Sequence, residues 1–71
     1  GQARWYAIDA RSANKSITVD SPENGGYAVY DEKGEMVHFS VATNQPSTQL
    51  PKNGFIVFGG DAGDVFQIQL K

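Results

Sequence analysis

Two residues with catalytic side chains, His38 and Ser40, lie close together in the sequence. A serine nucleophile needs a base within hydrogen-bond reach and a third group that orients the base, a role for which Asp31 is the candidate acid. Residues two apart on an extended strand share a face, so these two side chains can approach each other. No Gly-x-Ser-x-Gly elbow surrounds the serine, however. The pattern favours a solvated strand face over a small hydrolase, which stays open as an alternative.

Acidic side chains, which bind calcium through their oxygens, are scattered through the predicted turns. Asp61 and Asp64 could offer two ligands to a calcium ion, but the segment lacks the full spacing of a calcium loop. We therefore treat both residues as weak metal candidates and favour turn chemistry. The chain contains no cysteine, which excludes a disulfide and a thiolate metal site. We expect no cofactor, with a calcium-stabilised module as the less favoured alternative.

Exposed aromatic side chains are the clearest binding signal. Trp5 is predicted to face outward from the first strand and Tyr30 from the third, and Met36 and His38 are predicted on the outward face of the fourth. Aromatic rings on a rigid sheet can stack on sugars or anchor a peptide. The alternative is that each ring covers part of the small core, because single exposed aromatics need no functional explanation. These four residues are our candidates for contact with a ligand or partner.

Short strands would position these residues. The predicted strands span residues 3–10, 16–20, 27–30, 35–43, 48–50, 55–58 and 64–71. Glycine, proline, asparagine and aspartate separate them, and no window of ten residues shows helical periodicity without such a breaker. The pattern predicts an all-β fold: a small antiparallel β-sandwich, or a partly open barrel, of six to seven short strands without a substantial helix.

Alternation along the strands predicts which side chains form the core. The predicted inward sets are Tyr6, Ile8 and Ala10; Ile17 and Val19; Val37, Phe39 and Val41; and Phe66, Ile68 and Leu70. Residues 55–58 (Phe-Ile-Val-Phe) are apolar on both faces, so two large apolar side chains must point away from the core. Either barrel curvature or a crossing loop covers them, or a neighbouring domain or partner does.

Length and charge exclude several classes of protein. The 71 residues make one domain, 1–71, with a small core. Eight acidic and six basic residues give a net charge of −2, and no basic stripe is present. This argues against nucleic acid and anionic membrane surfaces as partners. No apolar run is long enough for membrane insertion.

Strand and turn positions follow one another in a recognisable order over residues 5–9, 17–19, 26–31 with Gly34, 50–57 and 66–70. This order resembles a known family, the β-sandwich modules of the bacterial pre-peptidase C-terminal type that are appended to secreted hydrolases. Two positions depart from the family pattern: Gly25-Gly26 replaces an acid before the third strand, and Phe55-Ile56 replaces a doubled tyrosine. Some members of the family bind calcium, and some bind collagen or polysaccharide. The residues that would match theirs are absent here, so neither calcium binding nor polymer binding is carried over.

The resemblance implies a non-catalytic accessory domain, excised from the C-terminal part of a larger extracellular or cell-envelope bacterial protein. The residues themselves indicate a compact all-β module without an assembled active site. We therefore expect a binding domain that is not an enzyme, and that docks on a parent catalytic domain or recognises a cell-surface or polysaccharide ligand. A purely structural spacer and a small hydrolase using His38 and Ser40 are the alternatives.

Overall fold

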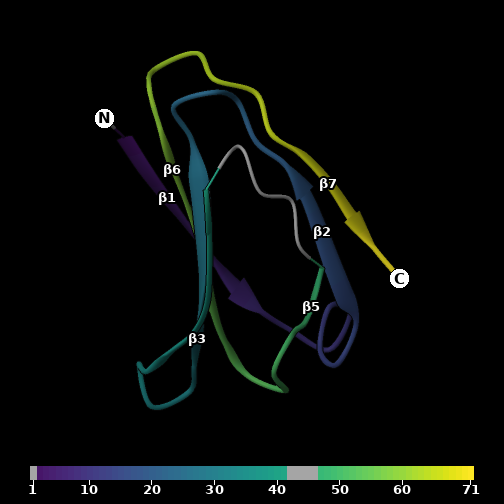
Figure 1. Ribbon diagram of the computed structural model, residues 1–71. Coiled ribbons are helices and arrows are strands. Elements are labelled where there is room, and N and C mark those ends of the chain that lie inside the picture. The colour runs from purple at the N-terminus through teal and green to yellow at the C-terminus, as the bar shows by residue number, and fades with distance from the viewer. Residues whose placement is uncertain (1, 42–46) are drawn as a thin grey trace.

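The computed structural model describes residues 2–41 and 47–71, which form two antiparallel β-sheets (Figure 1). The strands are β1 (Gln2–Ile8), β2 (Ser16–Asp20), β3 (Gly26–Asp31), β4 (Met36–Val41), β5 (Thr48–Gln49), β6 (Gly54–Gly60) and β7 (Gln67–Leu70). The larger sheet has the order β1-β6-β3-β4 and the smaller one β5-β2-β7. Neither sheet closes on itself, and the described residues contain no helix. The predicted all-β fold is confirmed as a small sandwich of two open sheets.

The hydrophobic core lies between the two sheets. Its buried members are Ile8, Ile17, Val19, Tyr27, Val29, Leu50, Ile56 and Phe58, with Ala13 and Phe66 packed against them. Those on β2, β3 and β6 occupy alternate positions of their strands, because every second side chain of a strand points to the same face, whereas Leu50, Ala13 and Phe66 lie outside the strands. Ile17 and Val19 face inward as predicted, and so do Ile8 and Phe66. Burying this apolar surface is the main favourable contribution to folding.

A row of rings crosses the inner face of the larger sheet. Tyr6 on β1 lies 5.7 Å from Phe58 on β6, which lies 6.1 Å from Tyr27 on β3. Tyr27 in turn lies 5.3 Å from the His38 ring on β4, and Phe66 approaches Phe58 from the smaller sheet at 5.3 Å. Ring pairs at these separations add stability beyond the area they bury. The row ties all four strands of the larger sheet to one layer of packing.

The turn between β3 and β4 is held by one carboxylate. Asp31 Oδ1 accepts hydrogen bonds from the backbone N–H groups of Lys33 at 2.9 Å and Glu35 at 3.0 Å. The N–H of Gly34 donates to the Asp31 carbonyl at 3.0 Å, and Gly34 has a φ of +82°, which glycine adopts without strain. Asp31 and Gly34 thus form the tight turn expected from their residue types.

A β-bulge follows this turn and changes the phase of β4. Val29 pairs with His38, but its neighbour Tyr30 pairs with Met36, so Val37 is an extra residue with no counterpart on β3. The extra residue shifts the alternation of β4 by one position, so each residue on either side of the bulge faces the same way as its partner on β3. Met36 therefore shares the outer face with Tyr30, whereas His38 shares the inner face with Val29.

The bulge makes the predicted faces of β4 wrong from Val37 onward. His38 and Ser40 were expected to face outward, but both lie on the inner face, and Ser40 is buried. Phe39 and Val41 were expected in the core, but they lie on the outer face, with Phe39 60% exposed. The prediction assumed strict alternation from Met36, and one extra residue reverses every side chain that follows it.

Two inward sets are less buried than predicted. β1 ends at Ile8, so Ala10 lies exposed in the next turn rather than in a strand. Ile68 and Leu70 pair with core residues of β2 and so face inward, but nearly half of each is exposed. They are exposed because β7 is an edge strand of the smaller sheet. The predicted end of the fourth strand at residue 43 and the turn after it fall outside the described residues.

Candidate functional site: the outer face of the larger sheet

Apolar side chains cover the outer face of the larger sheet. This outer face consists of Trp5 on β1, Phe55 and Val57 on β6, Ala28 and Tyr30 on β3, and Met36, Phe39 and Val41 on β4. The strand register places them together, since Trp5 and Ala28 both pair with Val57, and Phe39 pairs with Ala28. No other described element covers them, so Trp5 is 58% exposed and Met36 53% exposed. A contiguous exposed apolar patch on a soluble domain marks a contact surface more often than a stability feature.

Three aromatic rings form one end of the outer face. The Trp5 ring lies 5.6 Å from that of Tyr30, tilted by 33°, and 6.5 Å from that of Phe55, edge-on at 76°. These cross-strand pairs hold the rings in fixed positions. A rigid aromatic cluster loses little side-chain entropy when a partner covers it, which favours tight contact.

A shallow groove of 360 Å³ lies beside this cluster. Its walls come from Tyr30, Met36 and Phe39, and Gly26 and Gly59, which are paired across β3 and β6, supply a part of the lining without side chains. A Cβ on Gly26 would lie 2.6 Å from a backbone oxygen of β4, so alanine does not fit there. The groove is therefore built into the sheet rather than produced by one rotamer.

The groove and the aromatic cluster carry almost no charge. None of the eight side chains of the outer face is an acid, a base or a histidine. Their polar atoms are the indole N–H of Trp5, the hydroxyl of Tyr30 and the weakly accepting sulfur of Met36. Such a surface offers neither general acid-base chemistry nor ligands for a hard cation. What it can do is exclude water from an apolar partner.

The structure brings together three of the four predicted contact residues. Trp5, Tyr30 and Met36 share the outer face, whereas His38 lies behind the sheet against the Tyr27 ring. Sequence reasoning missed Phe39, because no sequence signal marks the bulge reliably. It did find the surplus of outward apolar residues on β6, which the structure places at Phe55 and Val57.

The alternative catalytic set is not assembled around His38. Among the described residues, Nε2 of His38 is buried and has no hydrogen-bond partner, so no carboxylate orients it there. Asp31 Oδ1 is occupied by the turn, and the Ser40 hydroxyl donates to the Val41 carbonyl at 3.4 Å. A serine hydrolase needs all three groups linked in one chain of hydrogen bonds. The geometry gives no support to the hydrolase alternative.

The weak metal candidates form a turn between β6 and β7. Asp64 Oδ2 accepts a hydrogen bond from the Asp61 N–H at 2.8 Å, and the Asp64 N–H donates to the Asp61 carbonyl at 3.1 Å. Gly63 has a φ of +88°, as the third residue of a type II turn requires. In the described ranges no three histidine or acidic side chains gather in a way that could hold a metal ion. The two aspartates thus serve the turn chemistry that their residue types favoured.

No family model, curated protein or solved structure matches this chain. In residues 2–41 and 47–71 there is also no helix of the length and apolarity needed to cross a membrane.

Proposed function

We propose that this chain is a non-catalytic binding domain whose outer face packs against an apolar surface of another protein. The observation that carries the proposal is the concentration of exposed apolar side chains on one face of one sheet. Trp5, Phe39 and Met36 are each more than half exposed there, although a solvated sheet face normally carries polar residues. Covering this face would remove a large apolar area from water, as protein interfaces do.

A protein partner fits this face better than a polysaccharide. Sugar rings stack on aromatic side chains, but their hydroxyls also need hydrogen-bond partners beside the rings. Around Trp5 and Tyr30 the neighbouring side chains are Phe55, Val57 and Met36, which provide almost none. Burying sugar hydroxyls against them would cost free energy. Aromatic residues and methionine are enriched at protein interfaces.

The resemblance to modules of secreted bacterial hydrolases supports a specific partner. The outer face would dock on the catalytic domain of the same parent protein, outside the cytoplasm. In that arrangement the domain contributes contact and position while the parent performs the chemistry. A polymer of the cell surface is the second kind of partner that the resemblance suggests, and the experiment below separates the two.

Hydroxyl-radical footprinting tests the docking proposal. The oxidation rates of Trp5, Met36 and Phe39 would be measured in this chain by itself and in the full-length gene product from which it derives. We expect all three rates to fall severalfold in the full-length protein, because a docked partner removes them from solvent. Tyr6 is a matched control, since it is 51% exposed but lies on the opposite side of the larger sheet.

Equal rates in both proteins would refute docking on the parent. Titration with cellulose, chitin oligomers and peptidoglycan fragments, followed by Trp5 fluorescence, then examines the polymer alternative. Tyr30→Ala, which removes a ring beside Trp5 but keeps the Trp5 reporter, should abolish any true response, and Gln69→Ala, which alters the other sheet, should not. No response to any of these polymers would leave the structural spacer as the surviving account.

A further inference from the structure

The sandwich is open along one side. Core residues near the closed side are fully hidden, with Ile17 0% and Leu50 1% exposed. On the other side, inward-facing Tyr6, Ile68 and Leu70 are 51%, 46% and 43% exposed. The difference arises because the larger sheet has four strands and the smaller has three, and both β1 and β7 are edge strands. The smaller sheet lacks the strand that would cover this seam.

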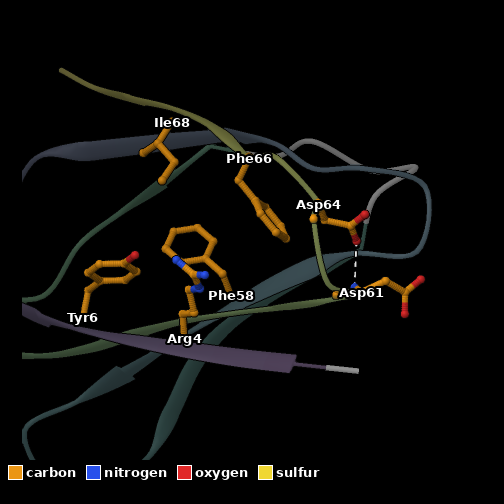
Figure 2. Close-up of a pocket in the computed structure, with 9 residues that line it drawn as sticks. Arg4, Tyr6, Phe58, Asp61, Asp64, Phe66 and Ile68 are labelled. Carbon is orange, nitrogen blue, oxygen red and sulfur yellow. Dashed lines mark hydrogen bonds between the residues drawn. The ribbon is translucent and has the colours of Figure 1, made fainter.

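A cavity of 250 Å³ occupies the open seam (Figure 2). Phe66 and Ile68 point into it from the side of the smaller sheet, and Arg4, Tyr6 and Phe58 point into it from the larger one. The turn that contains Asp61 and Asp64 closes one end. Phe58, Phe66, Ile68 and the ring of Tyr6 form the apolar part of the lining, and Arg4, Asp61 and Asp64 form its charged part. The apolar part suits apolar side chains that enter from the open side.

The free edge of β7 presents unpaired backbone groups above this cavity. Ser16 and Lys71 exchange two backbone hydrogen bonds, both of 3.0 Å, so they form a hydrogen-bonded pair. Bonded and non-bonded pairs alternate along antiparallel strands. Ile68 and Leu70, paired with β2 at the alternate positions, therefore direct their N–H and C=O groups away from β2 and toward the free edge. An edge of this kind is a template for another strand.

Arg4 is the one basic side chain among the residues that line the cavity. In Figure 2 the guanidinium group of Arg4 is directed into the cavity beside the Phe58 ring. Within the described part of the chain Arg4 forms no ion pair, and the pair found there joins Arg11 to Asp9. At the closing turn the Asp64 carboxylate accepts a hydrogen bond from the Asp61 N–H, and the Asp61 carboxylate accepts one from Asn24 Nδ2 at 3.5 Å. A partner with a carboxylate at this point would complement Arg4.

We propose that the free edge of β7 accepts an extended segment of a partner protein as a fourth strand of the smaller sheet. The added strand forms backbone hydrogen bonds with Ile68 and Leu70. Its inward side chains enter the seam: apolar ones pack on Tyr6 and Phe66, and an acidic one lies against Arg4. Main-chain bonds give the affinity of strand addition, and the alternate side chains give its specificity. This surface is separate from the outer face, and the inference does not depend on the function proposed above.

The peptide acetyl-Thr-Val-Thr-Glu-Thr-Val-Thr-amide is the probe, since its valines and glutamate share one face. A small panel of peptides with other apolar residues in place of the valines is tested beside it. We expect the Ile68 and Leu70 amide signals to shift on titration. Their hydrogen exchange should slow by about fivefold or more, the protection that one added hydrogen bond confers. A peptide of the same composition without alternation, Thr-Thr-Val-Val-Glu-Thr-Thr, should not cause these changes.

Charge and edge variants make the test specific. Replacing the peptide glutamate by glutamine should weaken binding by about threefold to fivefold, as expected of a partly exposed ion pair. In the Arg4→Gln chain the two peptides should bind equally, because the pair is then absent. Ile68→Lys places a charge in the seam and should abolish binding, whereas Gln69→Lys, on the opposite face of β7, should not. An unchanged Val29 methyl signal verifies that each variant is folded.

The proposal is overturned if no peptide of the panel perturbs the Ile68 and Leu70 amides. It is equally overturned if the non-alternating peptide binds as well as the alternating one. Shifts confined to β1 or to the outer face would show that the peptide binds elsewhere, which also rejects strand addition at β7.

Discussion

The bulge in β4 places the Phe39 side chain on the outer face of the sheet rather than in the core. The stability lost on replacing Phe39 tests this placement. A fully buried phenylalanine hides about 200 Å² of surface. Phe39 is 60% exposed, so at most roughly 80 Å² is hidden, and part of that is backbone. At about 25 cal/mol per Å², complete loss of this contact costs ~2 kcal/mol at most. Because threonine, like phenylalanine, is favoured in strands, we expect Phe39→Thr to cost about 1 kcal/mol.

The same substitution at Phe58 provides the matched control. Phe58 is 6% exposed and contacts the rings of Tyr6, Tyr27 and Phe66. Truncating a buried phenylalanine costs about 3–5 kcal/mol. A domain of this size has roughly 4–10 kcal/mol of total stability, so Phe58→Thr should lose most of its cooperative unfolding transition.

Urea denaturation and thermal denaturation, both followed by near-ultraviolet circular dichroism, measure both variants. In the thermal experiment we expect Phe39→Thr to lower the melting temperature by no more than about 8 °C, the shift that 1 kcal/mol produces in a small domain. If Phe39→Thr instead loses about 3 kcal/mol or more, as Phe58→Thr does, then Phe39 belongs to the core. The bulge assignment and the outer face as defined above would then both be wrong.

Three further perturbations test local features of the fold. Gly54→Ala should destabilise the protein by about 3 kcal/mol or more in urea denaturation, because a Cβ there would collide with the Tyr30 carbonyl at a φ of +140°. Gly34→Ala is its control: its φ of +82° is also positive, but no atom lies within 4 Å of the added Cβ, so it should cost only about 1–2 kcal/mol. Burial raises the pKa of Tyr27 above its ordinary value of 10.0, so the unfolded chain ionises first. Stability should therefore be complete below pH 10 and decline as the pH rises through the folded pKa; a Tyr27→Phe chain that declines equally would refute this. Asp31→Ala removes both side-chain bonds of the β3–β4 turn and should cost about 1–2 kcal/mol by the same measurement, and an unchanged stability would show that the turn does not need the carboxylate.

Calcium provides a test that needs no variant. Since the Asp64 carboxylate accepts the Asp61 backbone N–H and the Asp61 carboxylate accepts the Asn24 side-chain amide, we expect the same melting temperature in excess calcium and in chelator. A higher melting temperature in calcium would reveal a site, because a ligand that binds only the folded state must stabilise it.

Local residue patterns were enough to predict the strands and much of the core. The alternation of Ile17 and Val19 and of Phe66 and Ile68 follows from the geometry of a single extended strand, which needs no knowledge of its neighbours. Breakers between the strands likewise act locally, as Asp31 does in its turn. The aromatic contact candidates Trp5 and Tyr30 were also readable, because each stands opposite an inward neighbour.

Tertiary structure decided the faces of β4 and the open seam. An extra residue, Val37, reversed the phase of β4, and only the pairing with β3 shows where it is inserted. Whether Ile68 lies in a sealed core or at an open edge depends on which strand lies beside β7, which no property of β7 itself encodes. The sequence by itself therefore determined the period of each strand and the residues that alternate, because these depend on neighbouring residues along the chain. Only the folded molecule settled which face each side chain occupies, which residues pair across strands and which edge is left exposed. These features depend on strands that are far apart in sequence.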